Sequence, residues 1–473
     1  MSVDPGPSRW FGGFVARAHR HGELVVQPRM GMSQPATMRA GLLATRHAAA
    51  TTVGTITLDS YTRMGQDAEA RTAVAAGAEL NGYPIVAHDL ATTRAVLAGV
   101  AGPDFPVQVR HGSPRPERIF RALIGAGLHA TEGGPVSYCL PYSRTPLDAS
   151  VRAWAEGCRL LAGLREAGVE PHLESFGGCL MGQLCPPSLL IAVGVLEGMF
   201  FRQHGIRSVS LSYAQQTDPD QDREAVQALR RLATERMPDV DVHVVIYAYM
   251  GLHPKTPAGA TRLLIEAARL AVRTGAARLI VKTVAEAYRI PSIADNVDAL
   301  ETAAVAAAAE RSTPPPPPVP DTGLYSEASA LVDAVVGLRP DLGRALVDAF
   351  RLGYLDIPYC LHPDNAARTR SFIDRTGRLQ WSDIGSLPIR GLVRPTGSAR
   401  LTSAGLLASL SYLQRRFDEP SLERHPAPPV QVPGDAQREP KERRWPRPTS
   451  PVASTHCQPV PASTLPRRSP DRC

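Results

Sequence analysis

The chain has 473 residues, of which 43% are hydrophobic and 21% charged, a composition that is ordinary for a globular protein and leaves room for more than one domain. It has no apolar run of about 18 residues, and its first residues lack the basic-then-apolar order of a signal peptide, so we expect a cytoplasmic protein without a membrane span. Of the net charge of +7, +4 falls in residues 425–473 (eight Lys and Arg, four Asp and Glu), so we expect no folded basic face and no nucleic-acid partner.

Residues 24–290 alternate strand-like and helix-like segments. The strand candidates are mostly short apolar runs, as expected for parallel strands that are covered on both faces. Their ranges are 24–27, 53–58, 84–87, 106–109, 127–130, 171–174, 207–211, 241–247 and 278–282. Apolar residues spaced three and four apart predict helices between them, for example over 151–168, 223–237 and 261–275. This alternation predicts an α/β fold. An eight-stranded (β/α)8 TIM-type barrel fits better than an open sheet, and one strand candidate must then be extra.

Changes in composition divide the chain further. Residues 1–23 form an N-terminal arm before the first strand candidate, and the barrel domain is expected to cover 24–312. The run 313–320 contains five consecutive prolines, which exclude a helix and favour a stiff linker. Residues 321–424 carry two helical patterns and short strand-like pieces, which predict a smaller C-terminal α+β region. Residues 425–473 are rich in Pro, Arg and Ser, and we expect a disordered tail.

Positive side chains follow several of the strand candidates. Arg29, Arg63 and Arg110 each lie at or just beyond the end of a different candidate. A single arginine in such a place is most often a solvated surface charge. In a β/α barrel, however, the carboxyl ends of all strands meet at one mouth, where active sites form. The same rim would also carry His111, Glu132 and Lys282.

The arginines indicate the kind of ligand. Three guanidinium groups in one cleft repel each other and lose hydration, so such a cluster favours a ligand with more than one negative charge. Arginine forms bidentate pairs with carboxylates and with phosphates. The chain has no GxxxxGK[ST] motif and no convincing GxGxxG after a strand, which disfavours phosphate. We therefore favour a dicarboxylate, with Glu132 available for a cationic group of the same ligand, and an acidic amino acid fits this description.

Seven motifs in chain order show a family resemblance. They are QPRMG, TITLDSYTR, LNGYP, VQVRHGSP, ATEGGPVSYCLPY, IVKTVAEAYRIP and GYLDIPY. Together they resemble the large (epsilon) subunit of the adenosylcobalamin-dependent glutamate mutase, also called methylaspartate mutase, from about residue 24 to about residue 390. The resemblance implies a β/α barrel and an isomerase of glutamate metabolism. Such an enzyme interconverts L-glutamate and threo-3-methyl-L-aspartate by a radical carbon-skeleton rearrangement.

Matched motif by motif, the resemblance implies two sets of site residues. Those that would bind the substrate are Arg29, Arg63, Arg110, His111, Glu132, Tyr138 and Tyr142. Those that would contact adenosylcobalamin are Gly31, Asn81, Pro141, His253, Lys282, Glu286 and Ile290. The arginines would grip the substrate carboxylates, and Glu132 would meet the ammonium group. Lys282 and Glu286 lie four residues apart at a predicted helix start, which would place both on one face, suited to ribose hydroxyls. His253 stands where the family has an aromatic residue.

The cobalt ligand is expected to come from another chain. The DxHxxG signature, whose histidine ligates cobalt in this cofactor class, is absent; its nearest match, at 241–243, lies inside a predicted strand and favours core packing. The seven cysteines are scattered and form no CxxC pair, which argues for reduced thiols and against a zinc site. The resemblance implies a small cobalamin-binding sigma subunit as partner, in a heterotetramer built on an epsilon dimer.

Three alternatives stay open at this point. A related cobalamin mutase could use the same arginines to act on another acidic amino acid. A non-catalytic barrel homologue could have lost its partner subunit. A Schiff-base enzyme of aldolase type could use Lys282, because a lysine at a late strand end suits that chemistry.

Overall fold

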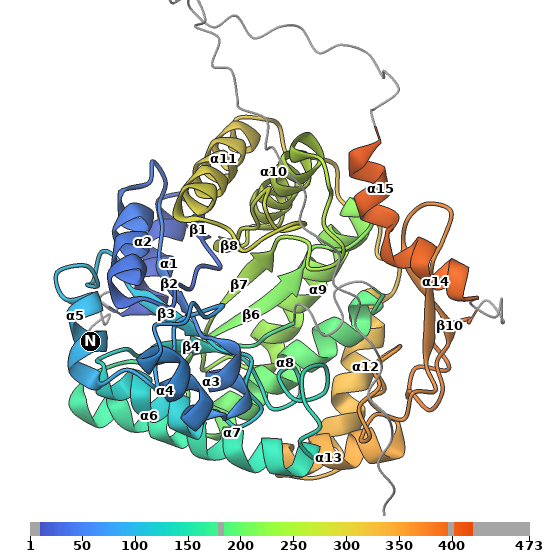
Figure 1. Cartoon of the computed structure of the whole chain (residues 1–473). Helices are drawn as coiled ribbons and strands as arrows, with labels where there is room; N and C mark the ends of the chain where they lie inside the picture. The colour runs from blue at the N-terminus through green and yellow to red at the C-terminus, as the bar shows by residue number, and fades with distance from the viewer. Residues whose placement is uncertain (1–9, 178–183, 396–401, 420–473) are drawn as a thin grey trace, which may run out of the picture. The chain divides into compact units, whose positions relative to one another are not determined.

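Eight parallel strands form the centre of the computed structural model, which describes residues 10–177, 184–395 and 402–419 (Figure 1). The strands are β1 (Val25–Gln27), β2 (Gly54–Thr57), β3 (Val107–Arg110), β4 (Ala130–Glu132), β5 (His172–Glu174), β6 (Ser208–Ala214), β7 (Asp241–Tyr247) and β8 (Arg278–Ile280). Their order in the sheet is β1-β8-β7-β6-β5-β4-β3-β2. A parallel bridge between Val26 and Thr52 links β1 to the segment before β2 and brings the two edges of the sheet together. The predicted TIM-type barrel is confirmed.

The strand candidate at 84–87 is the extra one, and the prediction of a strand there was wrong. Pro84 has no N–H to contribute to a ladder. It begins a turn instead, in which the Ala87 N–H donates to the Pro84 carbonyl at 2.9 Å. A short apolar run satisfies the strand pattern equally well when its side chains pack in a turn.

Helices connect the strands and cover the outside of the barrel (Figure 1). They are α2 (Pro35–His47), α3 (Ser60–Met64), α4 (Asp67–Ala75), α5 (Leu90–Leu97), α6 (Glu117–Gly125), α7 (Leu147–Ala162), α8 (Pro187–Gln203), α9 (Pro219–Arg236), α10 (Pro257–Thr274) and α11 (Ile293–Arg311). The expected helix at 261–275 corresponds to α10, which ends at Gly275 in the left-handed conformation (φ 64°). The helix expected over 151–168 stops earlier, at Ala162, where a 3₁₀ turn, η1 (Gly163–Ala167), follows.

The amino end of the barrel is closed by α1 (Phe11–Arg20), which lies within the expected N-terminal arm. Phe11 and Val15 pack into an apolar cluster with residues at the beginnings of the strands. Gly12 permits the close approach, because an added Cβ would overlap the Ser208 hydroxyl. The opposite end of the barrel, where the strands finish, is therefore the end left for a site.

The centre of the barrel is polar. Arg278 on β8 and Glu174 on β5 form an ion pair in which both side chains are fully buried. Gln27 on β1 accepts from Arg278 and donates to Gln108 on β3, the latter at 2.7 Å. The Ser210 hydroxyl on β6 donates to Glu174 at 2.9 Å. These contacts join five strands. They give the buried polar side chains the hydrogen-bond partners that water would otherwise provide.

The C-terminal region contributes α12 (Leu324–Val336), α13 (Leu342–Leu352), β9 (Arg370–Ile373), β10 (Leu379–Asp383), α14 (Ser403–Leu410) and α15 (Tyr412–Asp418). β9 and β10 pair antiparallel, so the expected smaller α+β region is present. α12 packs against α8 and α9 on the outside of the barrel. All described residues belong to one compact unit, and the boundaries at 312 and 320 stay a prediction. The tail expected at 425–473 lies outside the described residues.

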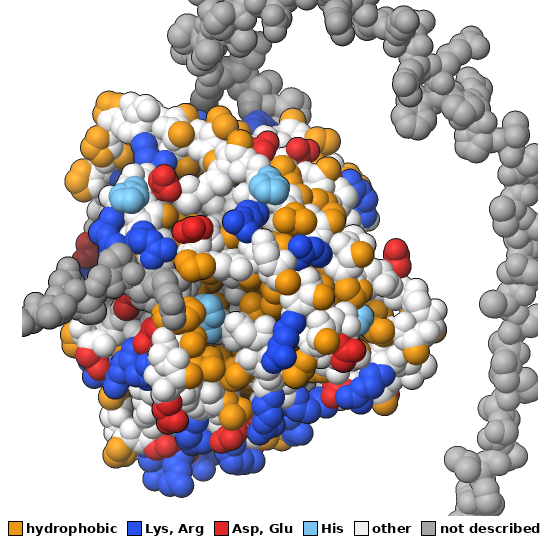
Figure 2. Space-filling model, turned by 90° about the vertical axis from the view of Figure 1, so that its left-hand side faces the viewer, with side chains coloured by type: hydrophobic (Ala, Val, Ile, Leu, Met, Phe, Trp, Pro, Cys, Tyr) orange, Lys and Arg blue, Asp and Glu red, His pale blue; other side chains and the backbone are white. Residues whose placement is uncertain are grey.

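Charged side chains of both signs lie on the face that Figure 2 shows. Acidic and basic side chains are mixed over most of this face, and Lys and Arg gather along its lower edge. None of the helices in the described part of the chain combines the length and the apolar character needed to cross a bilayer.

Candidate active site

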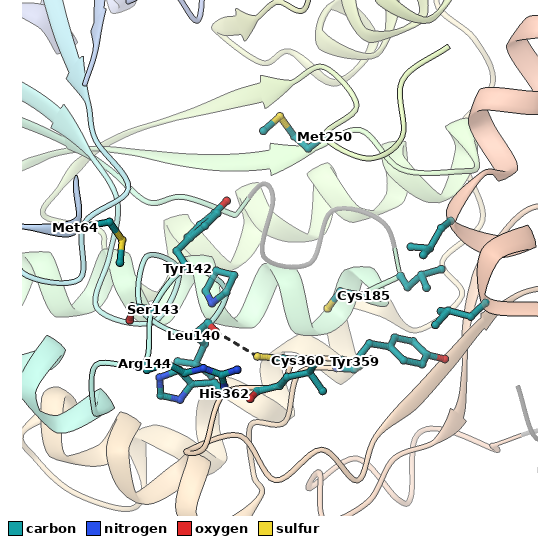
Figure 3. A pocket seen from close by; sticks show the side chains of 16 residues that line it. Met64, Leu140, Tyr142, Ser143, Arg144, Cys185, Met250, Tyr359, Cys360 and His362 are labelled. Carbon is teal, nitrogen blue, oxygen red and sulfur yellow. Dashed lines mark hydrogen bonds between the residues drawn. The ribbon is translucent and has the colours of Figure 1, made fainter. Parts of the chain in front are cut away.

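A cavity of about 730 Å³ opens at the carboxyl ends of the strands (Figure 3). Its walls come from the end of α3, from the segments after β4, β5 and β7, from residues 358–362 and from α14. Figure 3 shows Tyr142 extending toward Met250, with Met64 to one side. Pro141 and Tyr142, both expected at the site, line the cavity. This is the end at which β/α barrels carry their active sites.

Arg110 and Glu132 form a buried ion pair that is joined to this cavity through Tyr138, whose hydroxyl contacts Glu132 and whose ring contacts the lining residue Tyr142. Arg110 is the last residue of β3, and Glu132 is the last residue of the neighbouring β4. Arg110 Nη2 lies 2.9 Å from Glu132 Oε2, and the two side chains are 4% and 2% exposed. The guanidinium also lies over the Tyr247 ring, 5.1 Å from its centre. Burial opposes the charge of Arg110, but Glu132 together with Tyr247, Tyr138 and Glu174 outweighs this effect and raises the pKa of Arg110 above its usual value.

Two tyrosines complete the surroundings of the Glu132 carboxylate. The Tyr138 hydroxyl donates to Oε1, and the Tyr247 hydroxyl donates to Oε2 at 3.0 Å. Burial raises the pKa of Glu132, and the nearby Arg110 opposes that rise. The Tyr138 ring packs against Tyr142, with ring centres 6.1 Å apart, so the two predicted tyrosines lie together.

His111 supplies a neutral hydrogen-bond donor beside the ion pair. Burial lowers the pKa of His111 to about 3, against a smaller opposing effect of the Glu132 backbone. The ring Nδ1 accepts the Ser113 N–H at 3.0 Å, which leaves the proton of the neutral ring on Nε2. Nε2 of His111 and Nη1 of Arg110 are both buried, and neither makes a hydrogen bond of ordinary geometry with the described residues. Two unmatched donors at the end of one strand suit a ligand carboxylate.

Arg63 reaches the same group from α3. Its aliphatic chain passes Gly112, where an added Cβ would lie 3.4 Å from Arg63 Cδ. Arg63 Nη2 donates to the Ser60 hydroxyl at 3.3 Å, and that hydroxyl accepts from Asn81 Nδ2 at 2.6 Å. The structure therefore brings Arg63 together with Arg110 and His111, and it places Asn81 one contact further out.

Arg29 belongs by its contacts to a second group on the rim. Glu286 Oε2 lies 3.6 Å from Arg29 Nη1 and 3.7 Å from Lys282 Nζ. His253 is buried beside this pair of charges, and burial, followed by Lys282, lowers the pKa of His253 to about 4. Ile290, also expected near a cofactor, lies on the loop that carries Lys282 and Glu286 and is 62% exposed. We call these residues the Glu286 group and those around Arg110 the Arg110 group.

The helix expected to start at Lys282 is absent, and that prediction was wrong. Turns follow β8 instead, and α11 begins only at Ile293. Ser292 and Asp295 form a capping box there, which fixes the helix start further along the chain. Lys282 and Glu286 still meet, because a tight turn brings residues four apart together as a helix does.

Gly31 is required where the ends of β1 and β2 meet. The Thr57 N–H donates to the Met30 carbonyl at 2.9 Å, and a Cβ on Gly31 would overlap the Thr57 carbonyl oxygen. We expect Gly31→Ala to lower the melting temperature by a few degrees, because overpacking against backbone costs about 1–3 kcal/mol. Gly163→Ala is the matched control, since nothing lies within 4 Å of a Cβ there. Equal melting temperatures for the two variants would contradict the crowding at Gly31.

Comparison with known proteins assigns the family. The family model described as Methylaspartate mutase E chain (MutE) matches residues 6–407. The chain belongs to this family. The glutamate mutase epsilon subunit of Escherichia coli O157:H7 is 30% identical over 391 residues, covering 79% of this chain and 80% of that protein. That of Halobacterium salinarum is 33% identical over 356 residues, covering 73% and 74%.

A further relative and one solved structure are also similar to this chain. The glutamate mutase epsilon subunit of Desulfitobacterium hafniense is 30% identical over 365 residues, covering 74% of this chain and 75% of that protein. A solved structure, the spore coat polysaccharide biosynthesis protein spsE of Bacillus subtilis, aligns with a TM-score of 0.34 and 10% identity, covering 61% of this chain and 68% of that chain. The family membership is shown by the family model and by the sequence relatives.

Sequence reasoning missed several buried residues of the Arg110 group. Phe176 lies 4.7 Å from the Tyr138 ring, centre to centre. The Tyr247 hydroxyl lies within hydrogen-bond distance of both Glu174 and Glu132, so two carboxylates share its one proton. Glu174 and Tyr247 are the last residues of β5 and β7. The rule that residues at the carboxyl ends of barrel strands meet at one mouth, which we call the strand-end rule, selected Glu132 and would also have selected these two.

The residues nearest to a cobalt-ligand motif are structural. His243 lies within β7 and stacks on His172, with ring centres 5.1 Å apart and planes 9° apart. The expectation that residues 241–243 lie in a strand is confirmed, although Asp241 is exposed and the strand becomes fully buried only from Val244 on. Among the described residues, no three His, Cys, Asp or Glu side chains are grouped so that they could hold a metal ion.

Proposed function

We propose that this chain is the catalytic large subunit of an adenosylcobalamin-dependent mutase that interconverts L-glutamate and threo-3-methyl-L-aspartate. Within the family, the observation that carries this proposal is the pair of buried donors, Arg110 Nη1 and His111 Nε2, that no described residue satisfies. A substrate carboxylate would accept from both. Glu132, directly beside them, would take the ammonium group of the same amino acid.

The Arg110–Glu132 pair carries the two charges that an α-amino acid matches. Its atoms are 2.9 Å apart, and both side chains are buried. A zwitterion could enter between them with its carboxylate on Arg110 and its ammonium on Glu132, so that each buried charge exchanges one partner for another. Arg63 and Arg29 would hold the second carboxylate. Arg29 is free to do so because its pairing with Glu286 is long, at 3.6 Å, and its side chain is 31% exposed.

The Glu286 group fits the adenosyl part of the cofactor. Both ring nitrogens of His253 are buried and unbonded within the described chain, so a polar ligand group has partners there. Lys282 and Glu286 would hold ribose hydroxyls, and His253 would stack on a ring. Gly31, Asn81, Pro141 and Ile290 would face the corrin from the rim. When bound, adenosylcobalamin supplies the radical for the rearrangement, and this chain binds and orients the substrate and keeps water away from it.

The proposed partner is a small cobalamin-binding sigma subunit that carries the cobalt-ligating histidine. The rim offers it apolar side chains that are exposed in this chain: Met64 (59%), Leu252 (46%), Tyr288 (68%) and Ile290 (62%). Exposed apolar groups that gather around an opening suit a protein partner that covers the opening. We propose that the two subunits form a heterotetramer.

Reconstitution tests the proposal. The full chain is mixed with a DxHxxG subunit and adenosylcobalamin, and conversion of L-glutamate to 3-methylaspartate is followed. We expect turnover that requires both proteins. Arg63→Ala should raise KM for glutamate about tenfold or more, because a substrate carboxylate loses a charged partner. Arg152→Ala, on the exposed face of α7 where this side chain is 71% exposed, should leave KM unchanged.

The substrate panel separates the alternatives. Turnover of another acidic amino acid without turnover of glutamate would indicate a related mutase. Absence of turnover for every acidic amino acid, with a folded chain and a loaded partner, would contradict the proposal and favour a non-catalytic barrel.

A further inference from the structure

Glu197 is a fully buried carboxylate that lies outside the proposed substrate contacts. It belongs to α8, which the structure describes over its whole length, and it is the one ionisable side chain among the buried residues of that helix. Its Oε1 accepts the N–H groups of Val136 at 3.0 Å and Ser137 at 2.9 Å. Its Oε2 is buried and makes no hydrogen bond with the described residues. Burying a carboxylate is costly, so a specific role for this one is expected.

The two N–H groups belong to the loop that carries Tyr138. This loop forms a helical turn, in which the Tyr138 N–H donates to the Gly134 carbonyl at 3.1 Å and the Leu140 N–H donates to the Val136 carbonyl at 3.1 Å. The first N–H groups of such a turn have no partner within it. Glu197 accepts two of them and so fixes where the turn begins. The next residue is Tyr138, whose hydroxyl donates to Glu132.

The two glycines after Glu132 make this contact possible. An added Cβ on Gly134 would overlap the Glu197 carboxylate. Gly133 has φ +123°, a conformation that favours glycine, and a Cβ there would overlap the rings of Tyr138 and Trp154. The GGPVSY sequence thus lets the loop lie against the carboxylate on one side and lets the Tyr138 ring fold back on the other.

We infer that Glu197 is a positioning residue: by holding Val136 and Ser137 it orients the Tyr138 hydroxyl on Glu132, where the substrate ammonium is to bind. The identity of that substrate rests on the proposed function, but the contact between α8 and the loop does not. Burial raises the pKa of Glu197 to about 7, against the opposing N–H groups of Ser137 and Val136. Because Oε1 can accept in either protonation state, the neutral amide of glutamine should preserve the contact.

The test compares Glu197→Ala and Glu197→Gln with Asp222→Asn in the full chain. Asp222 is a matched control: it is also fully buried with its pKa raised by burial to about 7, and it also holds a loop, by accepting the Gln216 N–H at 3.0 Å and the Tyr213 hydroxyl at 2.8 Å. That loop follows β6 and carries no proposed substrate contact. Three measurements are made: amide hydrogen exchange in the segment 133–140, the steady-state KM and kcat for L-glutamate in the reconstituted enzyme, and the melting temperature.

We expect Glu197→Ala to speed exchange of the segment about tenfold and to raise KM about tenfold with a smaller change in kcat, since both loop amides lose their acceptor. Glu197→Gln should restore both quantities to within about threefold of the wild type, because its carbonyl still accepts. Asp222→Asn should lower the melting temperature without either effect. Should Glu197→Ala not fold, Gly134→Ala disturbs the same contact from the loop side and is expected to give the same two changes.

Unchanged exchange in the segment, or an unchanged KM in an active Glu197→Ala enzyme, would overturn the inference. Failure of glutamine to rescue would also overturn it, because that would mean that the charge rather than the acceptor matters. If the wild-type enzyme turns over no glutamate, the proposed function fails, while the exchange measurement still decides whether Glu197 positions the loop.

Discussion

Replacing Arg110 with alanine is expected to lower kcat/KM for L-glutamate about 10²- to 10³-fold or more in the reconstituted enzyme. The substitution leaves Glu132 without its buried partner and the substrate carboxylate without its clamp, and breaking a buried pair in this way costs about 3–5 kcal/mol. Arg110→Lys keeps the positive charge but loses the planar fork, so it should recover only part of the activity. Steady-state kinetics of the reconstituted enzyme with each variant give the comparison.

A loss of folding could imitate this result, and a double variant separates the two causes. Arg110→Met combined with Glu132→Gln removes both charges together, so neither is left buried alone, and we expect it to fold but to stay inactive. Arg159→Ala, on a side chain that is 59% exposed, should be fully active. If the double variant turned over glutamate at the wild-type rate, the pair would be structural, and the assignment of the substrate site would fail.

The barrel and its rim could be predicted because they follow from local patterns. Apolar runs that alternate with helical periodicity require parallel strands covered by helices, and parallel strands place their carboxyl ends at one edge. The strand-end rule therefore placed Arg110 and Glu132 on neighbouring strands before any contact was known. It applied equally to Glu174 and Tyr247, but no positively charged residue stands beside either of them in the sequence.

Other features depend on contacts that the sequence does not display. The run 84–87 has the composition of a strand, and only Pro84 and its neighbours decide that it turns. Arg29 pairs with Glu286 because β1 and β8 are adjacent in the closed barrel, although they stand at opposite ends of the domain sequence. Glu197 lies in an otherwise apolar helix, and its role becomes visible only when α8 is packed against the loop after β4.

Arg278→Leu is expected to give the largest loss of stability of any single substitution considered for this chain. Arg278 and Glu174 are a fully buried ion pair, and removing the guanidinium leaves the carboxylate with neutral donors alone. One-sided loss of a buried pair costs about 3–5 kcal/mol, a large share of the stability of an ordinary domain. Denaturant unfolding of the free chain, followed by circular dichroism, measures the difference.

The pH dependence of the free energy of unfolding is a second, independent test of the same ion pair. Burial opposes the charge of Glu174, but Arg278, Arg110 and the hydrogen bond from Tyr247 together outweigh this effect, so the pKa of Glu174 in the folded chain lies below its ordinary value of 4.5. The pair therefore stabilises the folded state above about pH 4.5, and this contribution is lost as the pH falls through the lower folded pKa. Glu174→Gln should remove that part of the acid dependence and lower stability at neutral pH.

A double variant, Arg278→Met with Glu174→Leu, should recover part of the stability that Arg278→Leu loses, because no charge is left alone. The recovery is only partial because Gln27 and Ser210 lose their partners. Wild-type stability in Arg278→Leu, or an unchanged acid limb in Glu174→Gln, would show that the barrel does not depend on this pair.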